Sequence, residues 1–506
     1  MKKYDLVVIG SGVGLTVLSQ ASSYGLKVAL VESGKMGGTC LTRGCIPTKV
    51  LVHPMDVIRE AQHAKKVGVH LKVEKVDWDL IAERMWSQID ESKQIDAGLS
   101  HAPGIDVYKG VGEFTGEYEM KVKLIKGGYS EPFQAERFVI SSGARTFIPP
   151  VKDLEKVDYI TSESFFGEKF PKKPWKSLII LGGGVIAAEF AHIFSTAGTE
   201  VTIIEMLPRL VSNEEPEISE FLLKNMQTYM KVHLGKKAIA AKKDGKNKVL
   251  IIEDVETGEK SEVKGEEILV ATGLKPNSDL LKVENTGVET DKRGWIITNE
   301  YLETNKENIW CIGDANGKYL FRHTGNQEAE VCVNNIFARD KESRVTMDYS
   351  AVPWAIFTHP QIAHVGITQT QAIEGGHQIF VAKKYYSSVA KGFAMGYAKG
   401  DVDDGFVKLI VDRSRKILGA HIVGPHAAAL IQSFVYLMNA GYQCVLPDEE
   451  GKPRIVESMA CPDGGSIRPI YKAQVIHPSI SEVAGWAIGA LRPVNIQRSG
   501  GHKHNH

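Results

Sequence analysis

The sequence is poor in three features, and each absence narrows its class. Only six of its 506 residues are cysteines, which is too few for a disulfide-rich secreted scaffold and favours a reducing compartment. Lys plus Arg and Asp plus Glu both number 61, so the basic surplus of a dedicated nucleic-acid-binding protein is missing. No apolar run reaches the roughly 20 residues of a membrane-spanning helix, and residues 6–9 are too short for the core of a signal peptide. We therefore expect a cytoplasmic protein without a membrane span or a nucleic-acid partner.

Apolar residues and glycine are, by contrast, plentiful. Hydrophobic residues make up 43% of the chain, which is enough for several cores. At roughly 150 residues per domain, the length suggests about three domains. The 49 glycines indicate many tight turns or places where the backbone approaches a ligand closely.

A pattern near the N-terminus is typical of a dinucleotide-binding βαβ unit. The apolar residues 6–9 lead into a helix, and a second apolar run at 28–31 ends in Glu32. The intervening turn holds three glycines: Gly10, Gly12 and Gly14. Such glycines let the backbone approach a pyrophosphate, and Glu32 is placed to bind a ribose. Leu15 stands where a third Gly or Ala is usual, so we expect looser packing of helix on strand there.

The same pattern recurs in the middle of the chain. The apolar run at 178–181 precedes a turn and helix, and the run at 201–204 ends in Glu205. The second turn satisfies the fingerprint with Gly182, Gly184 and Ala187. Glu205 favours NAD over NADP, because a carboxylate binds a free 2′-hydroxyl and repels a 2′-phosphate. Two such units predict two bound dinucleotides; the alternative is two ordinary strand–turn–helix units.

Cys40 and Cys45 are the only closely spaced cysteines. Five residues of regular helix rise about 7.5 Å, beyond the ~6.8 Å reach of a disulfide, so a bonded pair requires a bend, which Gly44 allows. Pro47 suits the first turn of a following helix, whose positive end would lower the pKa of the Cys45 thiol. The alternatives are two inert thiols or a zinc half-site, but a second close Cys or His pair is missing, so we predict no metal site.

The segment around these cysteines resembles the redox-active disulfide of the class I FAD-dependent pyridine nucleotide-disulfide oxidoreductases. It reads Gly-Gly-Thr-Cys, four residues, then Cys-Ile-Pro-Thr-Lys from residue 37 to 49, and the resemblance extends to about residue 491. It implies an α/β fold with two Rossmann-like domains, which bind FAD and NAD, and a C-terminal α+β dimerisation domain. The implied segments are FAD-binding residues 1–150, NAD-binding residues 151–275, a central FAD segment 276–346, an interface domain 347–495 and a disordered tail 496–506.

The resemblance also implies roles for the residues nearest the flavin. Cys40 is the exposed interchange sulfur that meets the substrate, and Cys45 faces the flavin. Lys49 approaches the flavin and pairs with Glu189 on the helix of the second unit. From the residues alone, Lys49 and Glu189 could instead be two solvated helix charges.

Near the C-terminus, His477-Pro478 is followed by Glu482, which matches the family's catalytic acid–base pair. A histidine near its working pH is suited to moving a thiol proton, and the glutamate would orient it. The resemblance implies that His477 reaches the disulfide of the other subunit, so the partner is a second copy in a homodimer with shared active sites. A packing or capping histidine is the alternative.

Further cofactor contacts follow from shorter matches. The residues implied for FAD are Thr39, Ser142, Gly143, Gly313 and Asp314, and Gly273 is implied for NAD. Asp314 follows an apolar strand and precedes a helix, so it could be only an N-cap.

The resemblance is strongest to dihydrolipoamide dehydrogenases, EC 1.8.1.4, which implies oxidation of a small dithiol or lipoyl-domain substrate with NAD as acceptor. The alternatives are an NAD(P)H-dependent reductase of another small disulfide or of mercuric ion, or a flavin-binding redox sensor or subunit with little turnover. One stretch departs from the family, because residues 443–471 form a longer connection than usual. It could be a plain surface insertion, or it could reshape the entrance to the disulfide.

Overall fold

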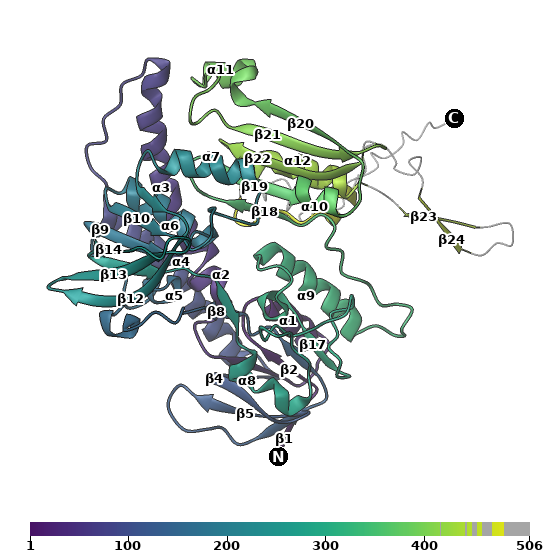
Figure 1. The fold of residues 1–506 in the computed structure, drawn as a ribbon. Helices are drawn as coiled ribbons and strands as arrows, with labels where there is room; N and C mark the ends of the chain where they lie inside the picture. The colour runs from purple at the N-terminus through teal and green to yellow at the C-terminus, as the bar shows by residue number, and fades with distance from the viewer. Residues whose placement is uncertain (415, 441–442, 448–452, 458–467, 480–506) are drawn as a thin grey trace, which may run out of the picture.

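The computed structural model describes residues 1–414, 416–440, 443–447, 453–457 and 468–479. It is a mixed α/β structure. Helices pack on the sheets of the N-terminal and middle parts of the chain, and the C-terminal part forms a separate antiparallel sheet (Figure 1). This arrangement confirms the predicted fold class, an α/β structure with two Rossmann-like units and a C-terminal α+β part. Among the described residues, no helix is both long and apolar enough to cross a bilayer.

The first unit is built on an eight-stranded sheet of order β1-β6-β5-β4-β3-β2-β7-β17. Its central turn is the predicted one, since α1 (Gly14–Ser23) connects the parallel strands β2 (Leu6–Ile9) and β3 (Val28–Glu32). The other strands are β1 (Lys2–Tyr4), β4 (Ile105–Gly116), β5 (Glu119–Leu124), β6 (Phe133–Ala135), β7 (Phe138–Ile140) and β17 (Ile309–Cys311). The helices of this region are α2 (Gly38–Thr42), α3 (Cys45–His63), α4 (Trp78–His101) and α9 (Arg322–Ile336). Apolar residues of α1 and α9 bury one face of the sheet.

The packing of α1 on β2 corrects one expectation. A Cβ added at Gly14 would lie 2.7 Å from Val8 Cγ1 and 2.3 Å from Ser141 Oγ, so the backbone at Gly14 fits tightly against the sheet. The helix begins at Gly14, and Leu15 is a partly buried residue that packs against the same core. The expected looser packing is therefore wrong, because Gly14 supplies the close approach that was assigned to position 15.

The second unit has a parallel four-stranded sheet of order β11-β10-β9-β15. The predicted turn joins β9 (Ser177–Leu181) through α6 (Val185–Thr196) to β10 (Glu200–Ile204). The remaining elements of this unit and its approach are α5 (Ser162–Phe165), α7 (Pro216–Met226), β11 (Lys231–His233), β12 (Lys236–Asp244), β13 (Asn247–Asp254), β14 (Lys260–Gly265) and β15 (Glu267–Val270). Strands β12, β13 and β14 form a separate antiparallel sheet that the sequence patterns did not predict.

The two units are joined by a pair of short strands. The chain leaves the first unit along β8 (Ala144–Thr146) and returns along β16 (Leu274–Pro276), which pair antiparallel. Arg145 on β8 donates hydrogen bonds at 2.9 and 2.7 Å to Asp279, in α8 (Ser278–Leu281). The domain limits near residues 150 and 275 stay a prediction.

The C-terminal part is a five-stranded antiparallel sheet of order β18-β19-β22-β21-β20. Its strands are β18 (Pro353–Ile356), β19 (Gln361–Gly366), β20 (Ile379–Tyr385), β21 (Phe406–Asp412) and β22 (Ile417–Gly424). Helix α12 (Ala427–Met438) covers one face of this sheet. The other helices of this part are α10 (Gln369–Glu374), α11 (Ala390–Ala394) and α13 (Arg468–Lys472). The opposite face shares a hydrophobic core with the second unit, so these two parts are packed together.

The long connection after α12 begins as a hairpin. Strands β23 (Gln443–Pro447) and β24 (Pro453–Glu457) pair antiparallel and project away from the five-stranded sheet and the two βαβ units (Figure 1). Its role as an insertion that shapes the disulfide entrance stays a prediction. Glu482, Cys461 and the predicted tail at 496–506 lie outside the described residues.

Candidate active site

A single cavity of about 1350 Å³ joins the glycine turns of both βαβ units to the cysteine pair. Most of the predicted site residues line its wall: Gly10, Gly12, Glu32, Thr39, Cys40, Cys45, Lys49, Ser142, Gly143, Gly182, Gly184, Glu189, Glu205, Gly273, Gly313, Asp314 and His477. Gly14 and Ala187 are buried behind this wall, where they pack helix against strand. The volume exceeds that of a typical pocket for one small ligand, and two glycine turns open into it.

The first glycine turn fits a flavin dinucleotide. The Oγ of Ser142 is buried on the cavity wall without a hydrogen-bond partner in the protein. A Cβ on Gly143, where φ is +66°, would meet no protein atom within 4 Å, so this backbone faces space that a ligand can fill. Glu32 is held in place at the end of β3, because its Oε2 accepts hydrogen bonds from the amide and hydroxyl of Ser11 at 2.7 and 2.6 Å.

Asp314 lies inside a 3-10 turn, Gly313–Asn316, and the N-cap residues of this turn and of the following helix α9 are Ile312 and Phe321, so Asp314 is not an N-cap. Burial, together with the charges of Cys45 and Glu328, raises the pKa of Asp314 to about 7. Glu328 anchors the turn. Its Oε2 accepts a hydrogen bond from the backbone amide of Gly313 at 2.5 Å, and its Oε1 accepts one from the side-chain Nδ2 of Asn316 at 3.0 Å. Asp314 therefore presents a partly buried carboxyl group to the cavity from a fixed loop.

The second glycine turn has the form expected for NAD. Gly184 is the N-cap residue of α6, and a Cβ there would meet no protein atom within 4 Å. Glu205 follows β10, and its Oε1 accepts the Leu207 amide at 2.7 Å. Its Oε2 lies so near the turn that a Cβ on Gly183 would approach it to 2.8 Å. Arg209, on the same wall, has a buried Nη1 without a hydrogen-bond partner.

The cysteine segment bends as the spacing predicts. Helix α2 ends at Thr42, and α3 begins at Cys45 after a two-residue connection. At Gly44 the backbone adopts φ −141° and ψ −115°, and a Cβ there would lie 3.0 Å from the Thr39 carbonyl oxygen. Cys45 therefore stands at the N-terminus of a 19-residue helix.

Both cysteines are free thiols, and their surroundings separate them chemically. A hydrogen bond from the Cys40 thiol, aided by the charges of Lys49 and His477, outweighs burial and lowers the pKa of Cys45 to about 6. The same hydrogen bond, together with burial, raises the pKa of Cys40 well above its ordinary value. Cys40 is only 8% exposed and Cys45 is partly buried, so exposure in the single chain does not distinguish Cys40 as the interchange sulfur. The pKa directions make Cys45 the thiolate of the pair.

Lys49 and Glu189 are brought together as predicted. The Lys49 ammonium lies 2.7 and 2.9 Å from the two carboxylate oxygens of Glu189, which is 5% exposed. The Phe357 amide donates to Glu189 at 3.0 Å, and the Phe357 ring lies 4.5 Å from the Lys49 ammonium. Three segments that are distant in the chain therefore hold one cation beside the cysteine pair.

His477 lies on the same cavity wall as Cys45 of its own chain, and its charge helps to lower the pKa of that thiol. The segment that carries it is held by Gln474, three residues earlier, which accepts a hydrogen bond from Thr324 at 2.9 Å and one from Gln432 at 3.0 Å. The His477 amide faces His323 Nδ1 at 3.5 Å. The resemblance implied a place beside the disulfide of the other subunit; in the single chain, His477 lines the same cavity as its own cysteine pair and is near enough for its charge to act on Cys45. Glu482, its predicted orienting partner, lies outside the described residues.

Several residues of the site were missed from the sequence. Arg322 lines the cavity and its charge acts on both Cys40 and Asp314, while His323 and Glu328 fix the neighbouring loops. All three lie on α9, directly after the loop that carries Asp314. The only sequence signal was a cluster of polar residues at the start of a helix, which carries no chemistry by itself.

Comparisons with known proteins match this geometry. A family model described as pyridine nucleotide-disulphide oxidoreductase matches residues 4–334, and the dimerisation domain of the same family matches residues 352–448. Mycothione reductase from Mycobacterium tuberculosis is 34% identical over 450 residues, covering 87% of this chain and 94% of that protein. Dihydrolipoyl dehydrogenase from Chlamydia pneumoniae is 32% identical over 499 residues, covering 98% of each. The Cu(II) complex of the HOCl-induced flavoprotein disulfide reductase RclA from Escherichia coli is 25% identical, with a TM-score of 0.74 over 97% of this chain and 100% of that one.

Proposed function

Because the chain belongs to the pyridine nucleotide-disulphide oxidoreductase family, we propose that it moves electrons between a small dithiol or disulfide and NAD through Cys40 and Cys45. It is a FAD-dependent flavoprotein oxidoreductase that uses a nicotinamide dinucleotide, and its dimerisation domain supports a homodimer. The proposal rests above all on one observation. The cysteine pair lies on a cavity wall between two dinucleotide-type glycine turns, and the pKa of Cys45 is lowered to about 6.

In the dithiol-oxidising direction, His477 accepts the proton of an entering substrate thiol. The substrate thiolate attacks Cys40 Sγ, the Cys40–Cys45 bond breaks, and Cys45 leaves as a thiolate that the Cys40 and Lys49 contacts stabilise. The second substrate thiol then attacks the substrate sulfur of the mixed disulfide and displaces Cys40. His477 gives its proton to the departing Cys40 sulfur and accepts the proton of the second thiol, and the substrate leaves as a disulfide. When bound, FAD couples this two-electron thiol chemistry to hydride transfer with NAD. Ser142, Gly143 and Asp314 would hold FAD, while Gly184, Gly273 and Glu205 would hold NAD.

For the substrate we propose dihydrolipoamide, free or on a lipoyl domain. The dihydrolipoyl dehydrogenase relative covers 98% of the chain, and the carboxylate of Glu205 favours NAD as the acceptor. A second candidate is the NAD(P)H-dependent reduction of another small disulfide, which the similarity to mycothione reductase supports. Reduction of mercuric ion is a third. The low number of cysteines supports the cytoplasm as its compartment.

A substrate panel tests this proposal. We expect the flavoprotein to reduce NAD with dihydrolipoamide at a kcat/KM at least tenfold higher than the value for any other dithiol, and higher than its NADH-dependent activity on mycothione disulfide or mercuric ion. A preference for mycothione disulfide would transfer the assignment to the second candidate. Cys40→Ser with undiminished dithiol turnover would refute the mechanism itself.

The alternative to an enzyme is a flavin-binding redox sensor or subunit with little turnover. Anaerobic titration with NADH distinguishes the two, because a thiolate next to the flavin gives a long-wavelength absorbance. We expect that absorbance in the wild-type protein and its loss in Cys45→Ser. Bleaching of the flavin alone in the wild type would favour the sensor.

Mixing two inactive variants tests whether the subunits share their sites. We propose sharing, as the family resemblance implies, although His477 lines the same cavity as Cys45 of its own chain. If sites are shared, a dimer of one Cys40→Ser subunit and one His477→Gln subunit contains one intact site, so refolding the mixture restores activity. If His477 serves its own chain, the mixed dimer has no intact site and stays inactive.

A further inference from the structure

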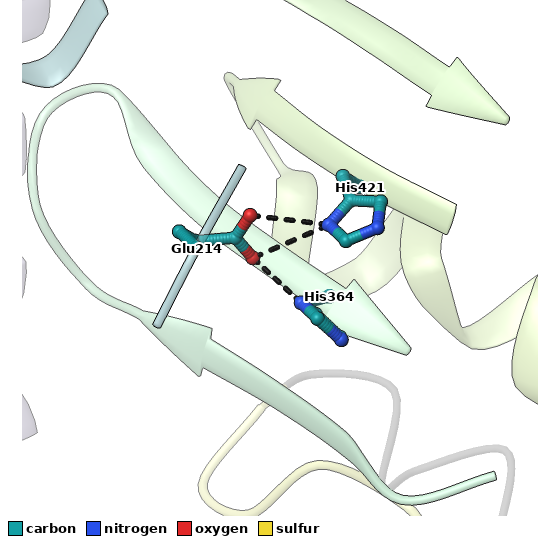
Figure 2. A group of neighbouring side chains, drawn as sticks. All are labelled: Glu214, His364 and His421. Atoms are coloured by element: carbon teal, nitrogen blue, oxygen red, sulfur yellow. Dashed lines mark hydrogen bonds and ion pairs between the residues drawn. The ribbon is translucent and has the colours of Figure 1, made fainter. Parts of the chain in front are cut away.

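A buried cluster of Glu214, His364 and His421 lies where the second unit meets the C-terminal sheet (Figure 2). Glu214 belongs to the loop before α7, His364 to β19 and His421 to β22. The two histidines are direct partners in the β19–β22 register, so they project from the same face of the sheet. The side chains of Glu214 and His421 are fully buried and that of His364 is 7% exposed.

The nitrogens of both rings have defined roles. Nδ1 of His364 lies 2.7 Å from one carboxylate oxygen of Glu214, and Nδ1 of His421 lies 3.1 Å from the other. Nε2 of His364 faces the Gly366 carbonyl at 2.7 Å, and Nε2 of His421 faces the Ile367 carbonyl at 3.2 Å. A carbonyl oxygen only accepts, so each Nε2 carries a hydrogen, and Nδ1 is the nitrogen that each ring turns toward Glu214. Without the ion a protonated ring donates from Nδ1 to the carboxylate; once that proton is released, Nδ1 offers a lone pair, and three ligand atoms then converge on one point.

We infer that Glu214, His364 and His421 bind one divalent metal ion of the zinc class. Their ligand atoms all lie within 4.8 Å of one another. A tetrahedral site with bonds of about 2.0 Å has ligand-to-ligand edges of roughly 3.3 Å, so shifts of a few tenths of an ångström would admit the ion. Two imidazoles and one carboxylate form a ligand set that zinc uses, with a water in the fourth position. The Nε2–H bonds to backbone carbonyls are the contacts that orient metal-binding histidines.

Glu214 is positioned by the Glu215 amide, which donates to its Oε2 at 2.7 Å. The Glu215 carboxylate lies 3.7 Å from Nε2 of His421 and is paired with the Lys408 ammonium at 2.9 Å, so this second carboxylate already has a cation. Lys408 also contacts Glu217 at 2.8 Å. His364 lines the wall of the large cavity, which provides a route of entry from solvent. The ion would join the second βαβ unit to the C-terminal sheet, at a place well separated in sequence from the cysteine pair.

Zinc itself is the probe. The purified 506-residue flavoprotein is stripped with a chelator and then titrated with zinc sulfate, with bound zinc measured by mass spectrometry and thermal unfolding followed in parallel. We expect the wild type to bind one more zinc per chain than His421→Gln or Glu214→Gln, which should lose affinity at this site by at least about 100-fold. We also expect zinc to raise the unfolding temperature of the wild type but not that of these variants.

His192→Gln is the matched control, since His192 is also buried but faces a single carboxylate, Asp56, at 2.9 Å. It should bind as much zinc as the wild type. Zinc held by the cysteine pair or by the C-terminal histidines cancels in these differences. Equal zinc in the wild type and His421→Gln, without a rise in unfolding temperature, would overturn the inference and leave a carboxylate between two protonated histidines. If neither variant folds, a wild-type unfolding temperature that zinc does not change would overturn it equally.

Discussion

Replacing Cys40 by alanine should remove the thiolate character of Cys45 near neutral pH. In the present site the pKa of Cys45 falls from the ordinary 9.0 to about 6, and the largest cause is the hydrogen bond from Cys40. At about 1.4 kcal/mol per pKa unit, the shift favours the thiolate by about 4 kcal/mol. Without the Cys40 donor, burial opposes the remaining charges of Lys49 and His477, so we expect the pKa to rise above about 8.

The assay is the rate at which iodoacetamide modifies Cys45 in the reduced protein between pH 4.5 and 10, read by peptide mass spectrometry. Because the thiolate is the nucleophile, the wild-type rate should rise with pH and reach half its maximum near pH 6. Cys40→Ser keeps a hydroxyl donor and should lie between the wild type and Cys40→Ala. Retained flavin absorbance would show that each variant is folded.

Two further variants fix the sign of the electrostatic contribution. Lys49→Met removes a cation and should raise the pKa of Cys45, whereas Glu189→Gln removes an opposing carboxylate and should lower it. A midpoint that stays near pH 6 in Cys40→Ala would refute the hydrogen-bond explanation. Shifts in the same direction for Lys49→Met and Glu189→Gln would refute the electrostatic one.

Three other substitutions probe the cofactor turns and the contact between the parts. Glu205→Ala should raise the KM for NADH by about 10- to 100-fold, because a charged hydrogen bond is lost, and should lower the ratio of kcat/KM for NADH to kcat/KM for NADPH. If this ratio is unchanged, Glu205 does not determine the choice of cofactor. Gly10→Ala, whose Cβ would lie 2.2 Å from a backbone oxygen, should abolish flavin retention, whereas Gly25→Ala, also at positive φ but with no atom within 4 Å, should retain it. Lys408→Met should destabilise the protein by about 3 kcal/mol in urea unfolding, because it leaves the buried Glu215 carboxylate without its ammonium partner, while Lys231→Met, at an exposed ion pair, should cost less than about 1 kcal/mol.

Features encoded within one short segment could be predicted from the sequence. The two strand–turn–helix units with their terminal acids, and the bend between Cys40 and Cys45, depend on residues that are close in the chain. The contact of Lys49 with Glu189 spans 140 residues and came from the family resemblance instead. The error at Leu15 arose because α1 starts one residue after its counterpart in the second unit, so that Gly14 faces the strand.

Features that depend on distant segments could not be predicted. Glu214 is 150 residues from His364 and 207 from His421, and none of the three stands in a recognisable motif. The position of Glu328 behind the Asp314 loop depends on how α9 packs, and a glutamate within a helix gives no sign of burial. The antiparallel sheet of β12, β13 and β14 alternates weakly between apolar and polar residues, so its pattern gave no clear strand period.

The two histidines also belong to a longer row that crosses the whole C-terminal sheet. Strand pairing aligns Trp354, His364, His421, Lys408 and Lys383, one from each of the five strands. Their neighbours along the strands, among them Ala363, Val365, Ala420 and Ile422, face α12 on the other side. Since a slip of one residue exchanges the two faces of a strand, a one-residue slip of β19 or β22 would turn its histidine toward α12 and bring an apolar side chain opposite the glutamates around the start of α7. The alternation of this row with the apolar face therefore specifies the strand register, because a sheet paired one residue out of register would be less stable than the native one.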